Sequence, residues 1–189
     1  MKTNYYNDVR LSQSKLKTYL KCPNLFKALY LDHSIEPEET DALIIGRAVD
    51  TYITEGEESF FNNFEKVARR SKHILDTSPT PFMGTAEIVQ LIIKDESKTQ
   101  LTGLMFDIAQ KMIGKIQQQP VMKMFKECDT QVELYDNDFK AKIDYLHISK
   151  TGTCTIADLK TIADTDKMYR QIEEYGYFFQ LAFYKFLIT

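Results

Sequence analysis

Two carboxylates and one amine lie in apolar stretches of the second half of the chain, where charge needs an explanation. Asp144 is in the segment Lys142-Ile-Asp-Tyr-Leu-His-Ile, and Asp158 and Lys160 are in Ile156-Ala-Asp-Leu-Lys-Thr. An isolated charge is costly to bury, so a strand that keeps such groups usually pairs them with one another or with a metal ion. The three residues therefore predict a metal site with a nearby ammonium group.

Strand geometry brings these groups together. Asp158 and Lys160 are two residues apart, so on a strand their side chains point to one face, and a neighbouring strand can place Asp144 beside them. Hard divalent cations such as Mg²⁺ and Mn²⁺ favour carboxylate, carbonyl and water oxygens, and the backbone carbonyl of Leu159 is a further candidate ligand. Such an ion polarises a phosphoryl oxygen, while Lys160 orients or helps to deprotonate the attacking water. The predicted chemistry is phosphodiester hydrolysis.

A salt-bridged pair on a surface strand is the alternative interpretation of Asp158 and Lys160. The alternation of the segment places Ile156 with the two charged residues on one face, and Ala157 and Leu159 on the other. Neither face is purely polar, which favours a partly enclosed cleft over open solvent.

The first half of the chain is predicted to be helical. Ser12 is a candidate cap for a first helix, which Pro23 interrupts or restarts, and a second helix is expected to begin near residues 41–43. Apolar spacing predicts two further helices between residues 85 and 125, and residues 71–84 are the expected flexible connection. Two apolar stripes of these helices are expected to pack in a core, namely Ile88, Leu91 and Ile92, and then Leu104, Ile108, Met112 and Ile116.

The second half is predicted to be a meander of hairpins followed by a helix. Three β-rich runs are expected at residues 130–135, 139–149 and 154–161. Turn signals separate the runs, and one long helix is predicted over residues 166–188.

Length and composition describe an ordinary globular chain. Its 189 residues, 43% of them hydrophobic, have room for one domain with a proper core. No apolar run reaches the roughly 18 to 20 residues that a membrane span needs. The first seven residues lack the apolar core of a signal peptide, so none is expected, and the three unpatterned cysteines do not predict a disulfide framework. A reducing cytoplasm, in a bacterium or encoded by a phage, is the expected location.

The net charge of −3 argues against a protein that coats nucleic acid through a global positive field. It is compatible with a nuclease, which needs only a local basic path to the scissile phosphate. The candidate basic residues, most of them expected to be solvated surface, are Lys15, Lys17, Lys21, Arg69, Arg70, Lys72, Lys123 and Lys126.

Several short motifs follow one another along the chain. They are Gly46-Arg-Ala-Val-Asp50, Glu133, Lys142-Ile-Asp144, Asp158-Leu-Lys160 and Gln180-Leu-Ala-Phe-Tyr184. Their order resembles the PD-(D/E)XK nuclease superfamily, specifically its RecB-like branch, and the opening Ser14 to Phe26, with its Cys-Pro-x-x-Phe unit, is similar to that branch's first helix. Within the branch, the layout over residues 12–188 most resembles the phage-type exonucleases related to exonuclease VIII, the RecE nuclease.

The resemblance implies a fold and a set of roles. The fold is an α/β restriction-endonuclease-like core, a single nuclease domain over residues 1–189 in which a small mixed β-sheet is flanked by helices, with a helical N-terminal half. The implied metal ligands are Asp144, Asp158 and the Leu159 carbonyl, with Lys160 as the catalytic lysine and Glu133 as an acidic group close to the site. The implied DNA-binding residues are Gln180 and Tyr184 of a Gln-x-x-x-Tyr motif, Tyr175 and Thr161. An exposed strand charge at Glu133 and a core role for Tyr184 are the plainer alternatives.

One position departs from the family pattern. The family's helix motif usually presents a histidine to the metal, and this chain has Asp50 there. An aspartate can ligate Mg²⁺ through oxygen and so preserve the site with a changed metal preference. The alternatives are a weakened or lost activity, or an ordinary aspartate on the surface of a helix.

The implied function is metal-dependent DNA hydrolysis with Mg²⁺ or Mn²⁺. The expected enzyme is an exonuclease that degrades double-stranded ends 5′ to 3′ for phage or prophage recombination and repair, together with a single-strand annealing recombinase, and related enzymes form homo-oligomeric rings. The alternatives are a RecB-like nuclease acting on single-stranded or branched DNA, and a catalytically weakened DNA-binding or assembly module. A further alternative is an unrelated interaction domain in which Asp144 and Asp158 lie more than about 10 Å apart, since ligands of one ion must be neighbours.

Two further expectations concern the cysteines and the end of the chain. Some RecB-like nucleases hold an iron–sulfur cluster with a cysteine at the position of Cys22 and three more after the Gln-Tyr helix. No cysteine follows Tyr184, so no cluster is expected. The sequence ends at Thr189 inside an apolar helical pattern, which predicts a fragment of a longer exonuclease.

Overall fold

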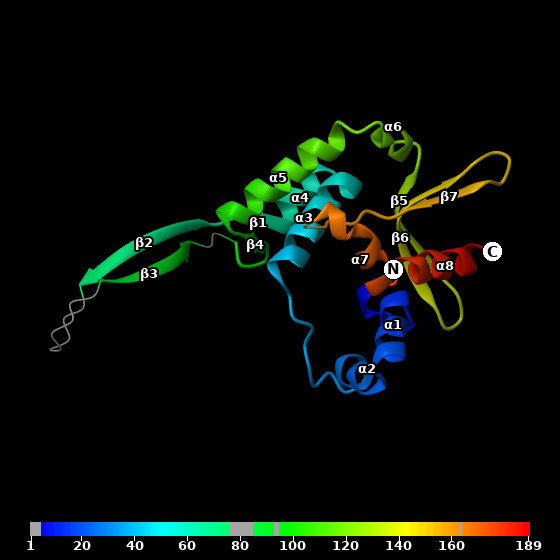
Figure 1. Ribbon diagram of the computed structural model, residues 1–189, viewed down its shortest axis with the longest axis horizontal. Helices are drawn as coiled ribbons and strands as arrows, with labels where there is room; N and C mark the ends of the chain where they lie inside the picture. The colour runs from blue at the N-terminus through cyan, green and yellow to red at the C-terminus, as the bar shows by residue number, and fades with distance from the viewer. Residues whose placement is uncertain (1–4, 76–84, 93–94, 163) are drawn as a thin grey trace. The chain divides into compact units, whose positions relative to one another are not determined.

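The computed structural model of the protein describes residues 5–75, 85–92, 95–162 and 164–189 (Figure 1). The chain divides into two compact units. The central unit is Thr40–Gln119, and the terminal unit combines Met1–Glu39 with Pro120–Thr189. Every predicted site residue except Asp50 belongs to the terminal unit.

The terminal unit begins with a short 3-10 turn, η1 (Tyr5–Asn7), followed by α1 (Gln13–Lys21) and α2 (Pro23–Tyr30). The Ser12 hydroxyl accepts a hydrogen bond from the backbone N of Lys15 at 3.4 Å, which confirms the predicted cap. Pro23 occupies the first turn of α2, where its missing N–H has no helical partner to lose. The prediction that Pro23 restarts the helix is therefore confirmed.

Three antiparallel strands form the sheet of the terminal unit. They are β5 (Asp129–Tyr135), β6 (Lys140–Ile148) and β7 (Cys154–Ala157), in the order β5-β6-β7. The predicted meander is confirmed, but the prediction that the last strand continues to Thr161 is wrong. The ladder ends at Ala157 because the backbone N–H of Leu159 donates to the Asp144 side chain. Asp158 and Lys160 thus lie just beyond the strand.

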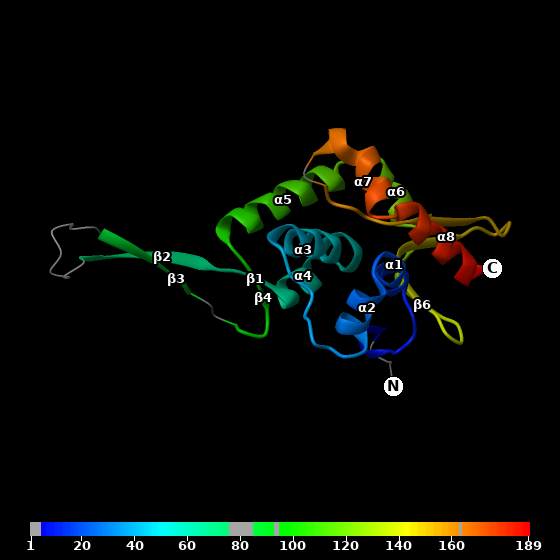
Figure 2. The ribbon, with the colours of Figure 1, turned by 60° about the horizontal axis from the view of Figure 1, so that its bottom comes forward.

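The C-terminal segment is broken into several pieces. These are the 3-10 turn η2 (Thr165–Lys167), α7 (Met168–Glu174) and α8 (Tyr177–Ile188). The prediction of one helix is wrong because Gly176 adopts the left-handed conformation, with φ 61° and ψ 47°, and turns the chain between α7 and α8. α8 packs against both α1 and β6 (Figure 2).

The core of the terminal unit lies between the sheet and α8. Ala141, Ile143 and Leu146 from β6 are buried together with Phe183 and Tyr184 from α8. A short helix, α6 (Val121–Phe125), adds Phe125, whose ring stacks on that of Tyr145 at a centroid distance of 4.0 Å. β6 is therefore the buried centre of this unit, and it also carries Asp144.

The central unit contains α3 (Asp41–Glu55), α4 (Glu57–Asn63) and α5 (Gly103–Gln117), and the first of these confirms the second predicted helix. The helix predicted from the spacing of Leu104, Ile108, Met112 and Ile116 is also confirmed as α5. Its buried residues are Met105, Ala109 and Ile113, so the core stripe is displaced by one residue from the predicted one. Leu104 of the predicted stripe is 71% exposed.

Two pairs of strands complete the central unit. β1 (Phe64–Lys66) pairs in parallel with β4 (Thr99–Leu101), and β2 (Ala68–Leu75) pairs antiparallel with β3 (Thr85–Ile92). The helix predicted over Ile88, Leu91 and Ile92 is wrong, because these residues form β3. Residues 71–75 of the expected connection belong to β2, and 76–84 lie outside the described residues.

Parallel and antiparallel pairing both occur in the described chain, but in separate small sheets, whereas a single mixed sheet was expected. Helices and small sheets together make an α/β protein. Within the described ranges, no helix is both long and apolar enough to cross a bilayer.

Candidate active site

Asp144 on β6 holds the segment that follows β7. Its Oδ2 atom accepts a hydrogen bond from the backbone N of Leu159 at 2.9 Å. The last pair of the β6–β7 ladder is Tyr145 with Ala157, so continuing the register by one residue places Asp158 opposite Asp144. The two predicted metal ligands are therefore neighbours. The alternative of an unrelated interaction domain expected them to lie far apart.

Asp158 is nearly buried and receives a donor on each carboxylate oxygen. Its Oδ1 atom accepts a hydrogen bond from Nε2 of Gln180 at 2.7 Å, and its Oδ2 atom forms an ion pair with Nζ of Lys160. The side chain of Asp158 is 9% exposed, whereas that of Lys160 is 37% exposed. The carboxylate is thus fixed from the protein side, and the ammonium group remains accessible to solvent.

Gln180 and Tyr184 connect Asp158 to the backbone of β6. The Gln180 amide donates to Asp158 and also to the Tyr184 hydroxyl, the latter at 2.6 Å, and that hydroxyl donates to the backbone carbonyl of Lys142 at 3.1 Å. Burial raises the pKa of Tyr184 far above its ordinary value, so the phenol stays protonated. Both side chains are buried, at 5% and 3% exposure, and their polar groups point inward. This geometry positions Asp158, and the implied DNA contact of the two residues stays a prediction.

Two further residues lie beside Lys160, namely Tyr177, which the sequence interpretation did not single out, and Lys17, which it named only among the candidate basic residues. The Lys160 ammonium is 5.6 Å from the centroid of the Tyr177 ring. Lys17 of α1 donates from Nζ to the backbone carbonyl of Tyr175 at 2.8 Å, and burial together with the charge of Lys160 lowers the pKa of Lys17. Tyr177 precedes Gln180 by three residues on one helix, a spacing that could have indicated it. The signal for Lys17 was its positive charge alone.

The remaining predicted residues make other contacts, and Glu133 is paired in register with Lys142 of β6. Tyr175 offers its backbone carbonyl to Lys17, and its side chain is 51% exposed. Thr161 is half-buried in the segment after β7. The carboxylate of Glu133 on β5 accepts a hydrogen bond from the Tyr135 hydroxyl at 2.7 Å. Asp50 lies on α3 in the central unit, and its metal contact stays a prediction.

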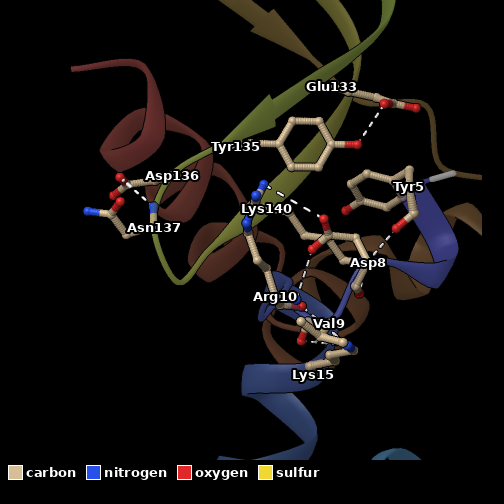
Figure 3. Close-up of polar contacts among 10 residues, drawn as sticks. All are labelled: Tyr5, Asp8, Val9, Arg10, Lys15, Glu133, Tyr135, Asp136, Asn137 and Lys140. Carbon is tan, nitrogen blue, oxygen red and sulfur yellow. Dashed lines mark hydrogen bonds and ion pairs between the residues drawn. The ribbon is translucent and has the colours of Figure 1, made fainter. Parts of the chain in front are cut away.

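Glu133 and Tyr135 adjoin a second polar cluster, centred on Lys140 (Figure 3). Lys140 is only 2% exposed, and its Nζ atom donates to the backbone carbonyls of Tyr5 and Asp8, the second at 2.8 Å. The same ammonium lies 4.5 Å from the centroid of the Tyr5 ring. Burial lowers the pKa of Lys140. These contacts fasten the N-terminal segment to the face of β6.

The Tyr5 hydroxyl makes this cluster sensitive to alkaline pH. Burial, followed by the neighbouring Tyr6, Tyr135 and Glu133, raises the pKa of Tyr5 from 10.0 to about 12. The folded state therefore keeps the phenol protonated where the unfolded chain ionises. Its favourable contribution is complete below pH 10 and is lost as pH rises toward 12. We expect wild-type stability to fall above pH 10 relative to Tyr5→Phe, measured by urea unfolding at a series of pH values.

The Tyr5→Phe variant keeps the ring that faces Lys140 and removes only the titrating hydroxyl. At about pH 8 both proteins should respond equally to pH, because Tyr5 is protonated in both states. Parallel stability curves from pH 8 through 12 would contradict the assignment of the shifted phenol.

The site residues fit a hard divalent cation. Asp158 supplies a nearly buried carboxylate whose Oδ2 atom faces the partly exposed Lys160 ammonium, and Asp144 supplies a second carboxylate beside it. In the part of the chain that the structure describes, no group of three or more His, Cys, Asp or Glu residues is arranged to hold a metal. A site with two carboxylates leaves the other positions to water and phosphate oxygens, which is how Mg²⁺ is usually bound.

Comparison with known families places this geometry in a wider context. Residues 12–189 match the family described as PDDEXK-like domain of unknown function (DUF3799). No curated protein and no solved structure gave a significant match. The match covers most of the chain and includes Asp144, Asp158 and Lys160, which the structure brings together. The chain therefore belongs to the DUF3799 family of PDDEXK-like domains and has a fold of the nuclease type.

Proposed function

We propose that this protein is a metal-dependent deoxyribonuclease whose active site is built from Asp144, Asp158 and Lys160. The observation that carries the proposal is the placement of Asp158 opposite Asp144, with the Lys160 ammonium on the Asp158 carboxylate. Membership of a PDDEXK-like family supports the same chemistry.

The proposed roles follow from these contacts. Asp144 and Asp158 would hold Mg²⁺ or Mn²⁺, which when bound supplies polarisation of a phosphoryl oxygen and a more acidic water. Gln180 keeps the Asp158 carboxylate in place through Oδ1 and leaves Oδ2 on the side of Lys160. Lys160, which is partly exposed, would orient the attacking water and offset the charge that develops on the phosphate.

We further propose that the enzyme acts on DNA ends. The order of the motifs, from Gly46 to Tyr184, supports an exonuclease of the RecB-like branch that processes double-stranded ends in phage or prophage recombination. A single-strand annealing recombinase and a ring of identical subunits belong to the same proposal. The second candidate is a catalytically silent DNA-binding module, which Asp50 in the place of the family's histidine favours.

The test is digestion of linear double-stranded DNA labelled at its 5′ or 3′ end, with Mg²⁺, Mn²⁺ or EDTA. We expect both ions to support degradation from the ends and EDTA to stop it, because the two carboxylates need a cation between them and the phosphate. The order in which the two labels are released reports the polarity. Closed circular DNA should remain intact.

Two outcomes separate the candidates. Cleavage of the closed circle would replace the exonuclease with an endonuclease and keep the metal chemistry. Binding of DNA without cleavage of linear, single-stranded or branched substrates, in either ion, would overturn the enzyme and support the silent module.

A further inference from the structure

The N-terminal segment Tyr5–Arg10 lies beside the candidate active site but outside the family match, which begins at residue 12. The Lys142 ammonium is 5.5 Å from the centroid of the Tyr6 ring. Lys142 precedes Asp144 by two residues on β6, so both side chains leave the strand on the same face, roughly 7 Å apart along it. Tyr6 therefore lies next to the site, and its side chain is 75% exposed.

Tyr6 is part of a row of three aromatic rings on this face. The ring of Tyr5 packs edge-on against Tyr6 at a centroid distance of 5.5 Å, and it lies 6.3 Å from the ring of Tyr135. Tyr135 is 37% exposed, and the guanidinium of Arg10 lies 4.9 Å from its ring centroid. We call Tyr5, Tyr6 and Tyr135, with Arg10 and Lys142, the tyrosine platform.

The platform rests on a rigid foundation. Lys140 alternates with Lys142 on β6 and, being buried, ties the carbonyls of Tyr5 and Asp8 to the strand. The backbone of Leu11 extends the attachment, since Lys140 N donates to Leu11 O at 3.0 Å. Tyr5 is thereby fixed, and the more exposed Tyr6 is held in front of Lys142.

Exposed aromatic rings interleaved with cations are suited to unpaired nucleobases. Bases stack on such rings in proteins that bind single strands, whereas the bases of a duplex are already stacked on one another. Arg10 and Lys142 attract the phosphate backbone, but the Asp8 carboxylate, 3.8 Å from the Arg10 guanidinium, offsets part of this charge. Stacking on Tyr6 and Tyr135 should therefore contribute more to binding than phosphate contacts.

We propose that the tyrosine platform binds the unpaired bases of single-stranded DNA adjoining the Asp144–Asp158 site. That the bound strand is a substrate rests on the proposed nuclease function. Stacking of its bases on the platform does not require cleavage. A merely structural role, in which Tyr6 only helps to fasten the N-terminal segment, is the competing explanation.

The chain contains no tryptophan, so a single introduced one gives a fluorescence signal of its own. The test is titration of the Tyr6→Trp protein with an oligothymidylate of roughly 12 nucleotides, a length within the usual site sizes, in EDTA to prevent cleavage. We expect the tryptophan emission to be quenched as bases stack on it. Tyr169→Trp is the matched control, because Tyr169 is a similarly exposed tyrosine, at 80%, on α7 of the same unit. Its emission should not change.

The second measurement is the affinity of each variant for the same oligothymidylate, now carrying a fluorescent label. Tyr6→Ala should weaken binding by roughly 5- to 100-fold, the usual effect of removing one stacking ring, and Tyr6→Phe should bind like wild type. Circular dichroism verifies that each variant is folded. Unquenched Tyr6→Trp, or Tyr6→Ala with wild-type affinity, would overturn the proposal.

The failures of the two proposals are distinguishable. If the wild-type protein cleaves DNA but the fluorescence of Tyr6→Trp is not quenched, the platform proposal is wrong and the nuclease proposal stands. If the fluorescence of Tyr6→Trp is quenched but the wild-type protein cleaves no DNA in Mg²⁺ or Mn²⁺, the single-strand binding surface stands and the nuclease proposal is wrong. A wild-type protein that binds no oligonucleotide overturns the platform.

Discussion

Replacement of Asp158 by asparagine is expected to lower kcat for DNA cleavage by about 10³-fold or more, since several kcal/mol of transition-state stabilisation by the metal is lost. Asparagine keeps the shape and an oxygen that can accept the hydrogen bond from Gln180. It removes the negative charge that would hold the cation and that pairs with Lys160. Single-turnover digestion of end-labelled duplex in saturating Mg²⁺ measures the effect.

Asp164→Asn is the matched control for this substitution. Asp164 lies six residues later and forms an ion pair with Lys167 at 3.1 Å, with its side chain 42% exposed. The same loss of charge outside the proposed site should leave kcat within about twofold, because exposed ion pairs contribute little. Equal rates for Asp158→Asn and Asp164→Asn would exclude Asp158 as a metal ligand.

Gln180→Leu is expected to destabilise the protein by about 3 kcal/mol, in spite of its similar volume. The substitution takes the amide donor away from the buried carboxylate of Asp158 and from the Tyr184 hydroxyl. Asp158 keeps its ion pair with Lys160, but a nearly buried, charged oxygen that loses its donor costs more than the loss of an ordinary hydrogen bond. The midpoint of urea unfolding measures the change. Cleavage by the folded variant should fall as well, because Asp158 loses its orientation.

Because the Gln180 amide donates to Asp158, the effects of substitutions at these two residues on stability should not be additive. Combined with Asp158→Asn, which has no charge to leave unpaired, Gln180→Leu should cost clearly less than it does alone. Gln117→Leu, at an exposed glutamine of α5, is the control and should shift stability by less than about 0.5 kcal/mol. Strict additivity of the two site substitutions would show that the Gln180 amide does not support the Asp158 carboxylate.

The elements that the sequence predicted correctly are those with local signals. Ser12 and Pro23 mark the boundaries of α1 and α2 by their own backbone chemistry. The turn residues between β5, β6 and β7 predict hairpins without reference to the rest of the chain. β3 was missed because the spacing of Ile88, Leu91 and Ile92 fits one face of a helix, while its pairing with β2 depends on residues far along the sequence.

The sequence predicted which residues form the candidate site better than it predicted their geometry. The motif order indicated Asp144, Asp158 and Lys160, and the β6–β7 hairpin together with the segment that follows it does bring them together. The expected placement of Asp158 on a strand was wrong because a side chain, Asp144, replaces the backbone partner of Leu159. Sequence patterns describe backbone ladders, and they carry no signal for this exchange.

Some contacts that the sequence did not predict join residues far apart along the chain. Lys17 and the Tyr175 carbonyl that it binds are 158 positions apart, and Tyr6 near the start of the chain lies against Lys142 of β6. No periodicity links such pairs, because the first depends on how α1 packs against the α7–α8 turn and the second on how the N-terminal segment packs against β6. A single glycine within an apolar helical pattern, such as Gly176, is likewise tolerated too often to predict a break.

Buried Lys140 makes the residues before the family match part of the folded unit, because its ammonium donates to the carbonyls of Tyr5 and Asp8. A recombinant chain trimmed to the family boundary at residue 12 would lack both carbonyls, of Tyr5 and Asp8, that accept hydrogen bonds from its ammonium. The charge would then be left in the sheet without those acceptors, or it would draw water into the face of β6 that carries Asp144. The boundary of sequence similarity is thus not the boundary of stability, and expression of the domain should start upstream of Tyr5.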